Sequence, residues 1–368
     1  MSFTADDHRF MARALHLAQH GLFTTTPNPR VGCVLVKDGA VIGEGWHEKA
    51  GGPHAEIVAL ADAERKLGAG GAAGCTAYVT LEPCSHHGRT PPCADALIGA
   101  RVARVVAAMQ DPNPLVAGEG LGRLRAAGIA AESGLLEAEA RELNIGFVAR
   151  MTRGRPWLRL KAAISLDGRT ALNNGVSQWI TGTAARRDAH AWRARSCAVL
   201  TGIGTVRDDD PRLTVREIAT SRQPLPVIVD NRLETPLTAR VLERPVLIFT
   251  ASRDDEKTAA LTARGAEVVV LPNASGQVDL PTLFTALGNR GCNEVLVEAG
   301  ARLNGALLRA GLVDELLIYQ APVLLGDAAR GMAALPEYLA LSETQRLQVL
   351  DRRMLGADLR ILARPERI

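Results

Sequence analysis

The chain has 368 residues, of which 47% are hydrophobic and 23% charged, and its formal net charge is +3. This length and composition are typical of a globular protein with two domains, and so small a charge does not indicate a nucleic-acid or membrane partner. No run approaches the roughly 18 apolar residues of a membrane span, and residues 1–21 lack the pattern of a signal peptide. We therefore expect a cytoplasmic protein, in which six cysteines favour metal binding or catalysis over a disulfide framework.

The first part of the chain alternates between helical and strand patterns. Apolar residues at helical spacing predict helices over 7–20 and 54–67, and we expect Ile57, Leu60 and Ala61 to form the buried face of the second. Further helices are expected at 93–99 and 135–150, and strands at 31–37, 41–46, 76–81 and 102–109. A turn signal, Asp38-Gly39, predicts a hairpin between the first two strands. Together these elements predict a three-layer α/β domain that ends near residue 150.

A glycine and a proline among charged residues at 152–156 predict a boundary, which divides the chain into domains at 1–150 and 151–368. The second domain alternates again, which favours another α/β domain. Its predicted strands lie at 157–164, 198–201, 226–230, 246–250, 267–271, 294–297 and 316–320, and its helices at about 184–195, 254–264, 280–289 and 302–310. The alternation at 346–363 predicts one more hairpin.

His54, Glu56, Cys84 and Cys93 form the most informative pattern in the sequence. A catalytic zinc commonly has three protein ligands and keeps a fourth position for water, which it makes more acidic. In zinc deaminases a glutamate two residues after the histidine ligand transfers protons without binding the metal. Eight residues separate the two cysteines here, where that signature has two. The longer insert is polar and rich in proline and glycine, which is typical of a loop that contacts substrate.

Two other interpretations of this pattern remain open. The zinc could be structural, with His86 or His87 as a fourth ligand. Alternatively, His54 could be a surface residue of its helix and the cysteines small buried apolar residues. The occurrence of all four residues in this order favours the catalytic metal site.

Several segments occur in the order that is typical of one known family. They are Thr26–Gly32, Gly52–Glu56, Thr80–Cys93 and Asp111–Pro114 in the first domain, and 161–169, 177–181 and 208–216 in the second. Over almost its whole length the chain closely resembles the bifunctional deaminase/reductase family of riboflavin biosynthesis. The resemblance implies a cytidine-deaminase-like three-layer α/β domain followed by a dihydrofolate-reductase-like α/β domain.

For the first domain the resemblance implies hydrolytic deamination of 2,5-diamino-6-ribosylamino-4(3H)-pyrimidinone 5′-phosphate, in which oxygen replaces a ring amino group. It implies that His54, Cys84 and Cys93 hold Zn²⁺ and that Glu56 transfers the protons, for which burial would raise its pKa. The positions that match substrate contacts are Asn28, His47, Arg89 and Asn113. The Arg89 guanidinium suits a phosphate, and a solvated loop charge is the alternative.

The second domain has weaker signals of its own. A turn with Gly202 and Gly204 follows one strand, and Glu298 ends another strand before a helix that begins near Gly300. The N-terminus of such a helix favours an anionic group, but neither stretch has the spacing of a dinucleotide-binding fingerprint. The residues by themselves therefore predict an α/β domain with a candidate phosphate site.

The resemblance implies that this domain transfers a hydride from NADPH to the sugar of 5-amino-6-(5-phosphoribosylamino)uracil and so converts ribosyl to ribityl. The positions that match substrate contacts are Ser177, Arg193, Leu213, Arg216 and Glu298. The positions that match cofactor contacts are Ala163, Trp179, Thr205, Asp209 and the glycine turn from Gly300 to Gly305.

Several roles in the second domain remain open. Either Lys161 or Glu298 could donate a proton to the sugar ring oxygen. Trp179 could instead be a core residue, and Asp209 an N-cap or a turn acid in an acidic loop. Arg207 is a candidate contact for the 2′-phosphate of NADPH.

Two other functions are compatible with parts of the sequence. One is a deaminase of nucleosides or nucleic acids fused to an unrelated α/β domain, and the other is a zinc-stabilised binding protein without catalysis. The long loop between the cysteines and the small net charge argue against nucleic acid. We therefore predict an enzyme of small phosphorylated pyrimidines that uses Zn²⁺ and NADPH, with no nucleic-acid or membrane partner, and a homo-oligomer as is common in the family.

Overall fold

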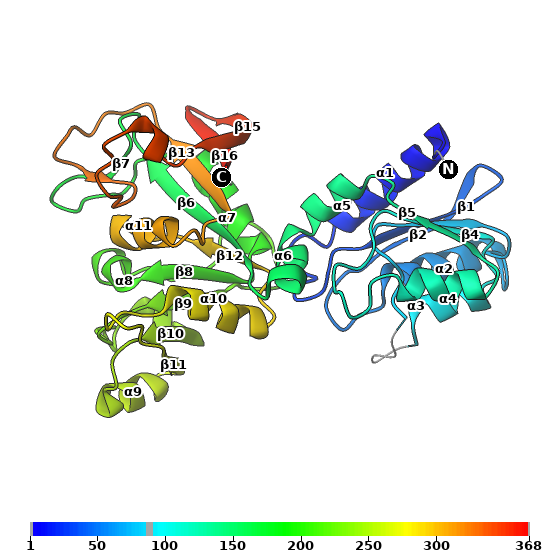
Figure 1. The fold of residues 1–368 in the computed structure, drawn as a ribbon, viewed down its shortest axis with the longest axis horizontal. Helices are drawn as coiled ribbons and strands as arrows, with labels where there is room; N and C mark the ends of the chain where they lie inside the picture. Colours follow the sequence, from blue (N-terminus) through cyan, green and yellow to red (C-terminus); the bar gives the residue numbers. More distant parts are fainter. Residues whose placement is uncertain (1–2, 86–90, 367–368) are drawn as a thin grey trace. The chain divides into compact units, whose positions relative to one another are not determined.

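The computed structural model describes residues 3–85 and 91–366, and the chain divides into two compact units, Met1–Gly154 and Arg155–Ile368 (Figure 1). The predicted boundary at residue 150 lies inside helix α6 (Ile145–Arg153), just before this division. Within the described residues, no helix has the length and apolar character that a membrane crossing requires.

The first unit is built on a five-stranded sheet in the order β2-β1-β3-β4-β5. The strands are β1 (Gly32–Lys37), β2 (Ala40–Trp46), β3 (Thr76–Val79), β4 (Arg104–Ala107) and β5 (Ala130–Ser133). β1 pairs antiparallel with β2 and β3, whereas β3, β4 and β5 are parallel. Asp38 and Gly39 have φ values of 49° and 76°, as a tight hairpin turn requires, so the predicted hairpin is confirmed.

Helices cover both faces of this sheet and complete the predicted three layers (Figure 1). They are α1 (Ala5–Gln19), α2 (Ala55–Leu67), α3 (Cys93–Gly99), α4 (Glu119–Ala126), α5 (Glu137–Leu143) and α6. α1 contacts α5 on one face, whereas α2, α3 and α4 follow one another on the other face. The sequence did not predict α4 and β5, since Gly120 and Gly122 weaken the helical pattern of α4.

The buried face of α2 differs from the predicted one. Ala61 is exposed, and Ile57 and Leu60 are only partly buried. The residues of α2 that are completely buried are Ala55, Ala59 and Ala63. The helix therefore packs through its smallest side chains, and its larger apolar residues lie beside the contact.

Two glycines of β2 explain this close packing. A Cβ atom at Gly45 would lie 2.4 Å from the carbonyl oxygen of Ala55, and one at Gly43 would lie 2.3 Å from that of Ala59. The backbones of α2 and β2 therefore approach so closely that no larger side chain fits between them. This contact holds the N-terminus of α2, where His54 and Glu56 lie, against the sheet.

The helix predicted over 135–150 is interrupted at Asn144, which separates α5 from α6. The backbone of Asn144 has φ −107° and ψ 22°, outside the helical region. Its side chain accepts a hydrogen bond from the Arg30 N–H at 2.8 Å and donates one to the Arg30 carbonyl at 2.9 Å. These side-chain bonds to the backbone compete with helix continuation and hold the segment that carries Asn28.

The second unit is built on a nine-stranded sheet in the order β11-β10-β9-β8-β12-β6-β13-β16-β15. Its strands are β6 (Trp157–Ile164), β8 (Ala198–Gly202), β9 (Leu225–Val229), β10 (Val246–Thr250), β11 (Ala266–Val270), β12 (Glu294–Val297), β13 (Glu315–Gln320), β15 (Leu347–Leu355) and β16 (Asp358–Pro365). The strands from β11 to β13 in this order are parallel, and β16 and β15 add antiparallel pairs at one edge. The predicted strands and the final hairpin are confirmed.

Helices also cover both faces of this sheet and enclose two hydrophobic cores. They are α7 (Thr183–Arg195), α8 (Ile203–Asp209), α9 (Asp255–Thr262), α10 (Leu280–Asn289) and α11 (Ala301–Arg309), with short 3-10 helices η1 (Arg240–Glu243) and η2 (Leu341–Glu343). A small ribbon of β7 (Arg169–Ala171) and β14 (Arg330–Gly331) was not predicted, nor was α8. Because the central strands are parallel, their carboxyl ends meet at one edge, where open α/β sheets bind ligands.

Candidate active sites

In the first unit three potential metal ligands converge. The nearest donor atoms of His54, Cys84 and Cys93 all lie within 4.8 Å of one another. His54 is the N-cap of α2, Cys93 is the first residue of α3, and Cys84 follows β3. No fourth histidine, cysteine or carboxylate joins this group in the described part of the chain, and His86 and His87 lie outside that part.

Hydrogen bonds within the group favour a thiolate at Cys84. The His54 Nδ1 atom lies 3.2 Å from the Cys93 Sγ and 3.7 Å from the Cys84 Sγ, and the Cys93 backbone N–H donates to Cys84 at 3.3 Å. The hydrogen bond from the Cys93 thiol lowers the pKa of Cys84 to about 4, and the pKa of Cys93 is raised in turn. The hydrogen bond with Cys84 raises the pKa of His54. Imidazole and thiolate donors from separate elements are the set that zinc prefers, so these residues fit the metal.

Glu56 lies in the first turn of α2, beside the three potential metal ligands but outside the group that they form. It is 3% exposed, and burial raises the pKa of its carboxyl to about 7. The expected effect of burial on this glutamate is therefore confirmed. A carboxyl group with a pKa near neutrality can both accept and donate a proton.

His47 lies next to the potential metal ligand His54 and is bonded to Asn28. The Asn28 side-chain N–H donates to His47 Nε2 at 3.0 Å, and His47 Nδ1–H donates to the Pro53 carbonyl at 2.9 Å. The His47 and His54 rings are 5.3 Å apart, and burial lowers the pKa of His47. A neutral His47 held in one tautomer therefore orients the Asn28 amide beside the metal site.

The other two predicted substrate contacts of this unit are Asn113 and Arg89. Asn113 lies in the segment after β4, where its N–H donates to Asp111 at 2.8 Å and its amide oxygen accepts from the Leu115 N–H at 3.1 Å. Arg89 lies outside the described residues.

In the second unit, a cavity of about 1810 Å³ opens at the carboxyl ends of the parallel strands. Its volume exceeds the roughly 300–1,000 Å³ of a site for one small ligand, so it can hold a cofactor and a substrate together. The predicted residues that line it are Lys161, Ala163, Ser177, Trp179, Arg193, Thr205, Asp209, Leu213, Arg216, Glu298 and Gly300. Arg207 also lines it and pairs with Glu234 at 3.1 Å.

Gly305 is the predicted cofactor contact that does not line this cavity. It lies inside α11, where a Cβ atom would be 2.1 Å from the carbonyl oxygen of Ala334. This glycine therefore permits a close approach of two backbones within the fold.

An ion-pair cluster occupies one side of the cavity. Arg193 donates two hydrogen bonds to Glu298, at 2.5 Å and 2.8 Å, and Lys161 Nζ lies 3.9 Å from the same carboxylate. Although burial raises the pKa of Glu298, the neighbouring Arg193 and Lys161 lower it more, to about 2. Burial lowers the pKa of Lys161. Glu298 is therefore an anion at neutral pH, whereas Lys161 carries a proton that is easier to release.

Sequence reasoning missed His190, which lines the cavity on α7 and is 7% exposed. Burial and the nearby Arg193 and Arg216 lower the pKa of its ring to about 4. Its Nδ1 atom accepts a hydrogen bond from the Arg216 N–H at 3.3 Å. The signal that could have revealed it is its spacing of three residues from Arg193, which puts both on one helix face.

Two alternatives for the second unit, a core position for Trp179 and an N-cap role for Asp209, are wrong. Trp179 is not a core residue, since it is 68% exposed and the Arg186 guanidinium lies 4.7 Å from the centre of its ring. Asp209 does not cap the start of a helix, because it is the last residue of α8, where it accepts a hydrogen bond from Ser177 at 3.4 Å.

Both halves of the chain match known protein families. Residues 4–109 match the cytidine and deoxycytidylate deaminase zinc-binding region, and residues 156–359 match the RibD C-terminal domain. The chain is 50% identical over 365 residues to the riboflavin biosynthesis protein RibD of Escherichia coli, which covers 96% of this chain and 97% of that protein. A deaminase fused to an unrelated domain would not show this similarity over both halves.

Solved structures show the same relationship. RibD of Acinetobacter baumannii has a TM-score of 0.91 and 46% identity, over 98% of this chain and 99% of that chain. A diaminohydroxyphosphoribosylaminopyrimidine deaminase/5-amino-6-(5-phosphoribosylamino)uracil reductase of Thermotoga maritima has a TM-score of 0.87 and 35% identity, over the same shares of 98% and 99%. The chain therefore belongs to the RibD family and is a bifunctional enzyme of riboflavin biosynthesis, with a zinc-binding deaminase domain and a reductase domain that uses a nicotinamide cofactor.

Proposed function

We propose that the first unit deaminates 2,5-diamino-6-ribosylamino-4(3H)-pyrimidinone 5′-phosphate and that the second reduces the resulting 5-amino-6-(5-phosphoribosylamino)uracil with NADPH. The observation that carries the first step is the convergence of His54, Cys84 and Cys93 beside the buried Glu56. The name of the Thermotoga maritima relative, a diaminohydroxyphosphoribosylaminopyrimidine deaminase/5-amino-6-(5-phosphoribosylamino)uracil reductase, supports the two substrates.

In this proposal His54, Cys84 and Cys93 hold the zinc, which when bound makes a water molecule acidic enough to deprotonate near neutral pH. Glu56 accepts a proton from the attacking water and passes it to the ring nitrogen. It then takes the proton of the hydroxyl group that has been added to the ring carbon and gives it to the amino group, which departs as ammonia while the carbonyl forms. Its place in the first turn of α2, beside the ligands, supports this role. Burial excludes bulk water from the proton path.

The proposed substrate contacts of the first unit are Asn28, His47, Asn113 and Arg89. The His47 ring supports the Asn28 amide, which can bind the donors and acceptors of a pyrimidine edge. Arg89 would bind the phosphate with its planar guanidinium.

For the reductase we propose Lys161 as the residue that protonates the sugar ring oxygen when the hydride reaches the sugar carbon. The anionic Glu298 is then a substrate contact that also holds Lys161 and Arg193 in place. The further substrate contacts are Ser177, Arg193, Leu213 and Arg216, and the proposed cofactor contacts are Ala163, Trp179, Thr205, Asp209 and Gly300. Two arginines in one cavity suit a phosphate group.

We propose NADPH rather than NADH as the hydride donor, with Arg207 as a contact of the 2′-phosphate once the Arg207 side chain leaves Glu234.

We also propose that the protein is a homo-oligomer and that it is located in the cytoplasm. The edge strand β15 exposes Val349 and Met354, at 51% and 61%, and a second copy of the chain could cover them. The six free cysteines agree with a reducing compartment.

The test is to incubate zinc-loaded protein with the diaminopyrimidinone ribosylamine phosphate, with and without NADPH, and to resolve the products by mass. We expect ammonia and the deaminated product without NADPH, and the ribityl product only after NADPH is added. Folded, zinc-containing protein that releases no ammonia would contradict the proposed substrate. Parallel reactions with cytidine and with NADH test the alternative deaminase substrate and the cofactor preference.

A further inference from the structure

Glu82 connects the segment of the metal ligand Cys84 to the loop that carries Asn113. It follows β3, directly before Pro83 and Cys84, and is 5% exposed. Its carboxylate accepts backbone hydrogen bonds from Asp111 at 3.0 Å, Gly118 at 2.9 Å and Leu121 at 3.1 Å. One side chain thus supplies the acceptor for two N–H groups of the loop before α4, those of Asp111 and Gly118, and for one N–H group in the first turn of α4, that of Leu121.

This arrangement matters because the loop cannot move independently of Glu82. A buried backbone N–H that loses its hydrogen-bond acceptor destabilises the folded protein. A carboxylate is also a stronger acceptor than a neutral group. Three such bonds from residues 111–121 to one carboxylate therefore hold the loop in a single position.

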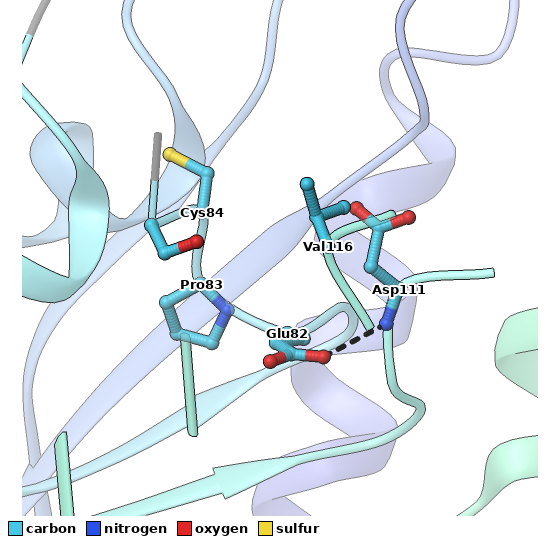
Figure 2. A pocket seen from close by; sticks show the side chains of 6 residues that line it. Glu82, Pro83, Cys84, Asp111 and Val116 are labelled. Carbon is cyan, nitrogen blue, oxygen red and sulfur yellow. Dashed lines mark hydrogen bonds between the residues drawn. The ribbon is translucent and has the colours of Figure 1, made fainter. Parts of the chain in front are cut away.

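The two segments are also in direct backbone contact. A Cβ atom at Gly120 would lie only 1.9 Å from the Pro83 carbonyl oxygen. Figure 2 shows the small pocket between the segments, lined by Glu82, Pro83, Cys84, Ser85, Asp111 and Val116. The volume of this pocket is about 10 Å³, which is no more than one water molecule needs. A shift of the loop would therefore change the packing beside Cys84.

Asn113 depends on this connection through Asp111. The Asp111 N–H is bound by Glu82, and the Asp111 side chain in turn accepts the Asn113 N–H at 2.8 Å. We propose that Glu82 is a positioning residue of the deaminase. Its carboxylate holds residues 111–121 in the position from which Asn113 contacts the pyrimidine ring of the substrate. This inference rests on the proposed role of Asn113 as a substrate contact.

The test compares deaminase kinetics and zinc content of the full-length zinc enzyme with those of Glu82→Gln. Glutamine keeps the volume but has only one acceptor oxygen, so its amide nitrogen faces a backbone N–H. We expect an increase in KM of about tenfold, a smaller change in kcat and an unchanged zinc content. Gly120→Ala keeps the Glu82 carboxylate but places a Cβ atom 1.9 Å from the Pro83 carbonyl oxygen and 3.3 Å from the Glu82 Cγ, so it should displace the segment and raise KM in the same direction.

Glu132→Gln is the matched control, because it removes a carboxylate bonded to Arg104 in the same unit. It should leave KM unchanged even where thermal stability falls as much as in Glu82→Gln. An equal rise of KM in this control, or loss of zinc from Glu82→Gln, would overturn the positioning role.

Asn113→Ala separates this inference from the proposed function. Unchanged KM in Asn113→Ala would contradict the substrate role of Asn113 and remove the basis of the inference. Raised KM in Asn113→Ala with unchanged KM in Glu82→Gln would overturn the inference alone. In the double variant, Glu82→Gln should add little to the effect of Asn113→Ala, whereas full additivity would show that Glu82 does not act through Asn113.

Discussion

Arg193 and Glu298 form two parallel hydrogen bonds on one side of the reductase cavity, which join the last turn of α7 to the residue that follows β12. This two-point geometry is the strongest form of an arginine–carboxylate contact. It keeps Glu298 ionised and leaves Lys161, beside the same carboxylate, as the cavity's candidate proton donor.

The stability of the second unit should depend on pH through Glu298. Its folded pKa, about 2, lies below the ordinary value of 4.5. Its contribution is therefore complete above pH 4.5 and is lost as the pH falls towards 2, because the unfolded chain binds the proton first. A shift of this size corresponds to at most roughly 3 kcal/mol of unfolding free energy.

Denaturant unfolding followed by fluorescence at several pH values measures this effect, since three of the four tryptophans, Trp157, Trp179 and Trp192, lie in the second unit. Glu298→Gln should be less stable than the unaltered protein near neutrality and should lose less stability on acidification. Glu267→Gln is the control, because its ion pair with Arg290 is exposed and contributes little. Identical acid profiles for Glu298→Gln and the unaltered protein would refute this assignment.

Cys84→Ser should remove zinc and abolish deamination while the reductase activity stays unchanged. A serine hydroxyl is a poorer zinc ligand than a thiolate, and the described residues that line the reductase cavity all belong to the second unit. Metal analysis and separate assays of the two reactions check this. Cys75→Ser is the matched control, because Cys75 is buried in the same unit but lies outside the metal group, and it should keep its zinc. Loss of reduction by a well-folded Cys84→Ser protein would mean that the two activities are not separate.

Glu56→Gln should keep its zinc and lose deamination. The amide has nearly the same volume but cannot carry protons, so we expect kcat to fall by about 10²–10⁴-fold. Zinc content and ammonia release are measured on the same sample. Deamination at the original rate would exclude Glu56 as the proton carrier. It would favour a reaction in which the zinc site acts without this glutamate.

Gly45→Ala should destabilise the first unit and weaken zinc binding. The added Cβ would lie 2.4 Å from the backbone oxygen of Ala55, so α2 must move, with His54 at its start. Overpacking of this kind typically costs about 1–3 kcal/mol. Gly122→Ala, in a helix of the same unit with nothing within 4 Å of the added atom, is the control and should not lower the melting temperature. A Gly45→Ala protein as stable as this control would show that the contact between α2 and β2 adapts easily.

Much of the fold could be predicted because it depends on local patterns. The apolar runs of the parallel strands, the Asp38-Gly39 turn and the terminal hairpin all carry their signal within a few neighbouring residues. The prediction of one continuous helix over 135–150 was wrong, because the helix is interrupted at Asn144, whose hydrogen-bond partner Arg30 is more than a hundred residues away. The residues next to Asn144 and next to Arg30 in the sequence do not indicate this bond.

The sequence by itself determined the chemistry of this protein. The candidate metal donors, the adjacent glutamate and the charged residues of the second unit can be recognised from residue type and order, because ligand preference and proton transfer depend on the functional groups present. Only the tertiary structure decided how these groups are used. It selected the alanine face of α2 through the glycines of β2, placed Gly305 against Ala334 and bound Glu82 to a distant loop. Such choices follow from backbone approach and hydrogen-bond partners between segments far apart in the chain, and a local pattern contains no information about them.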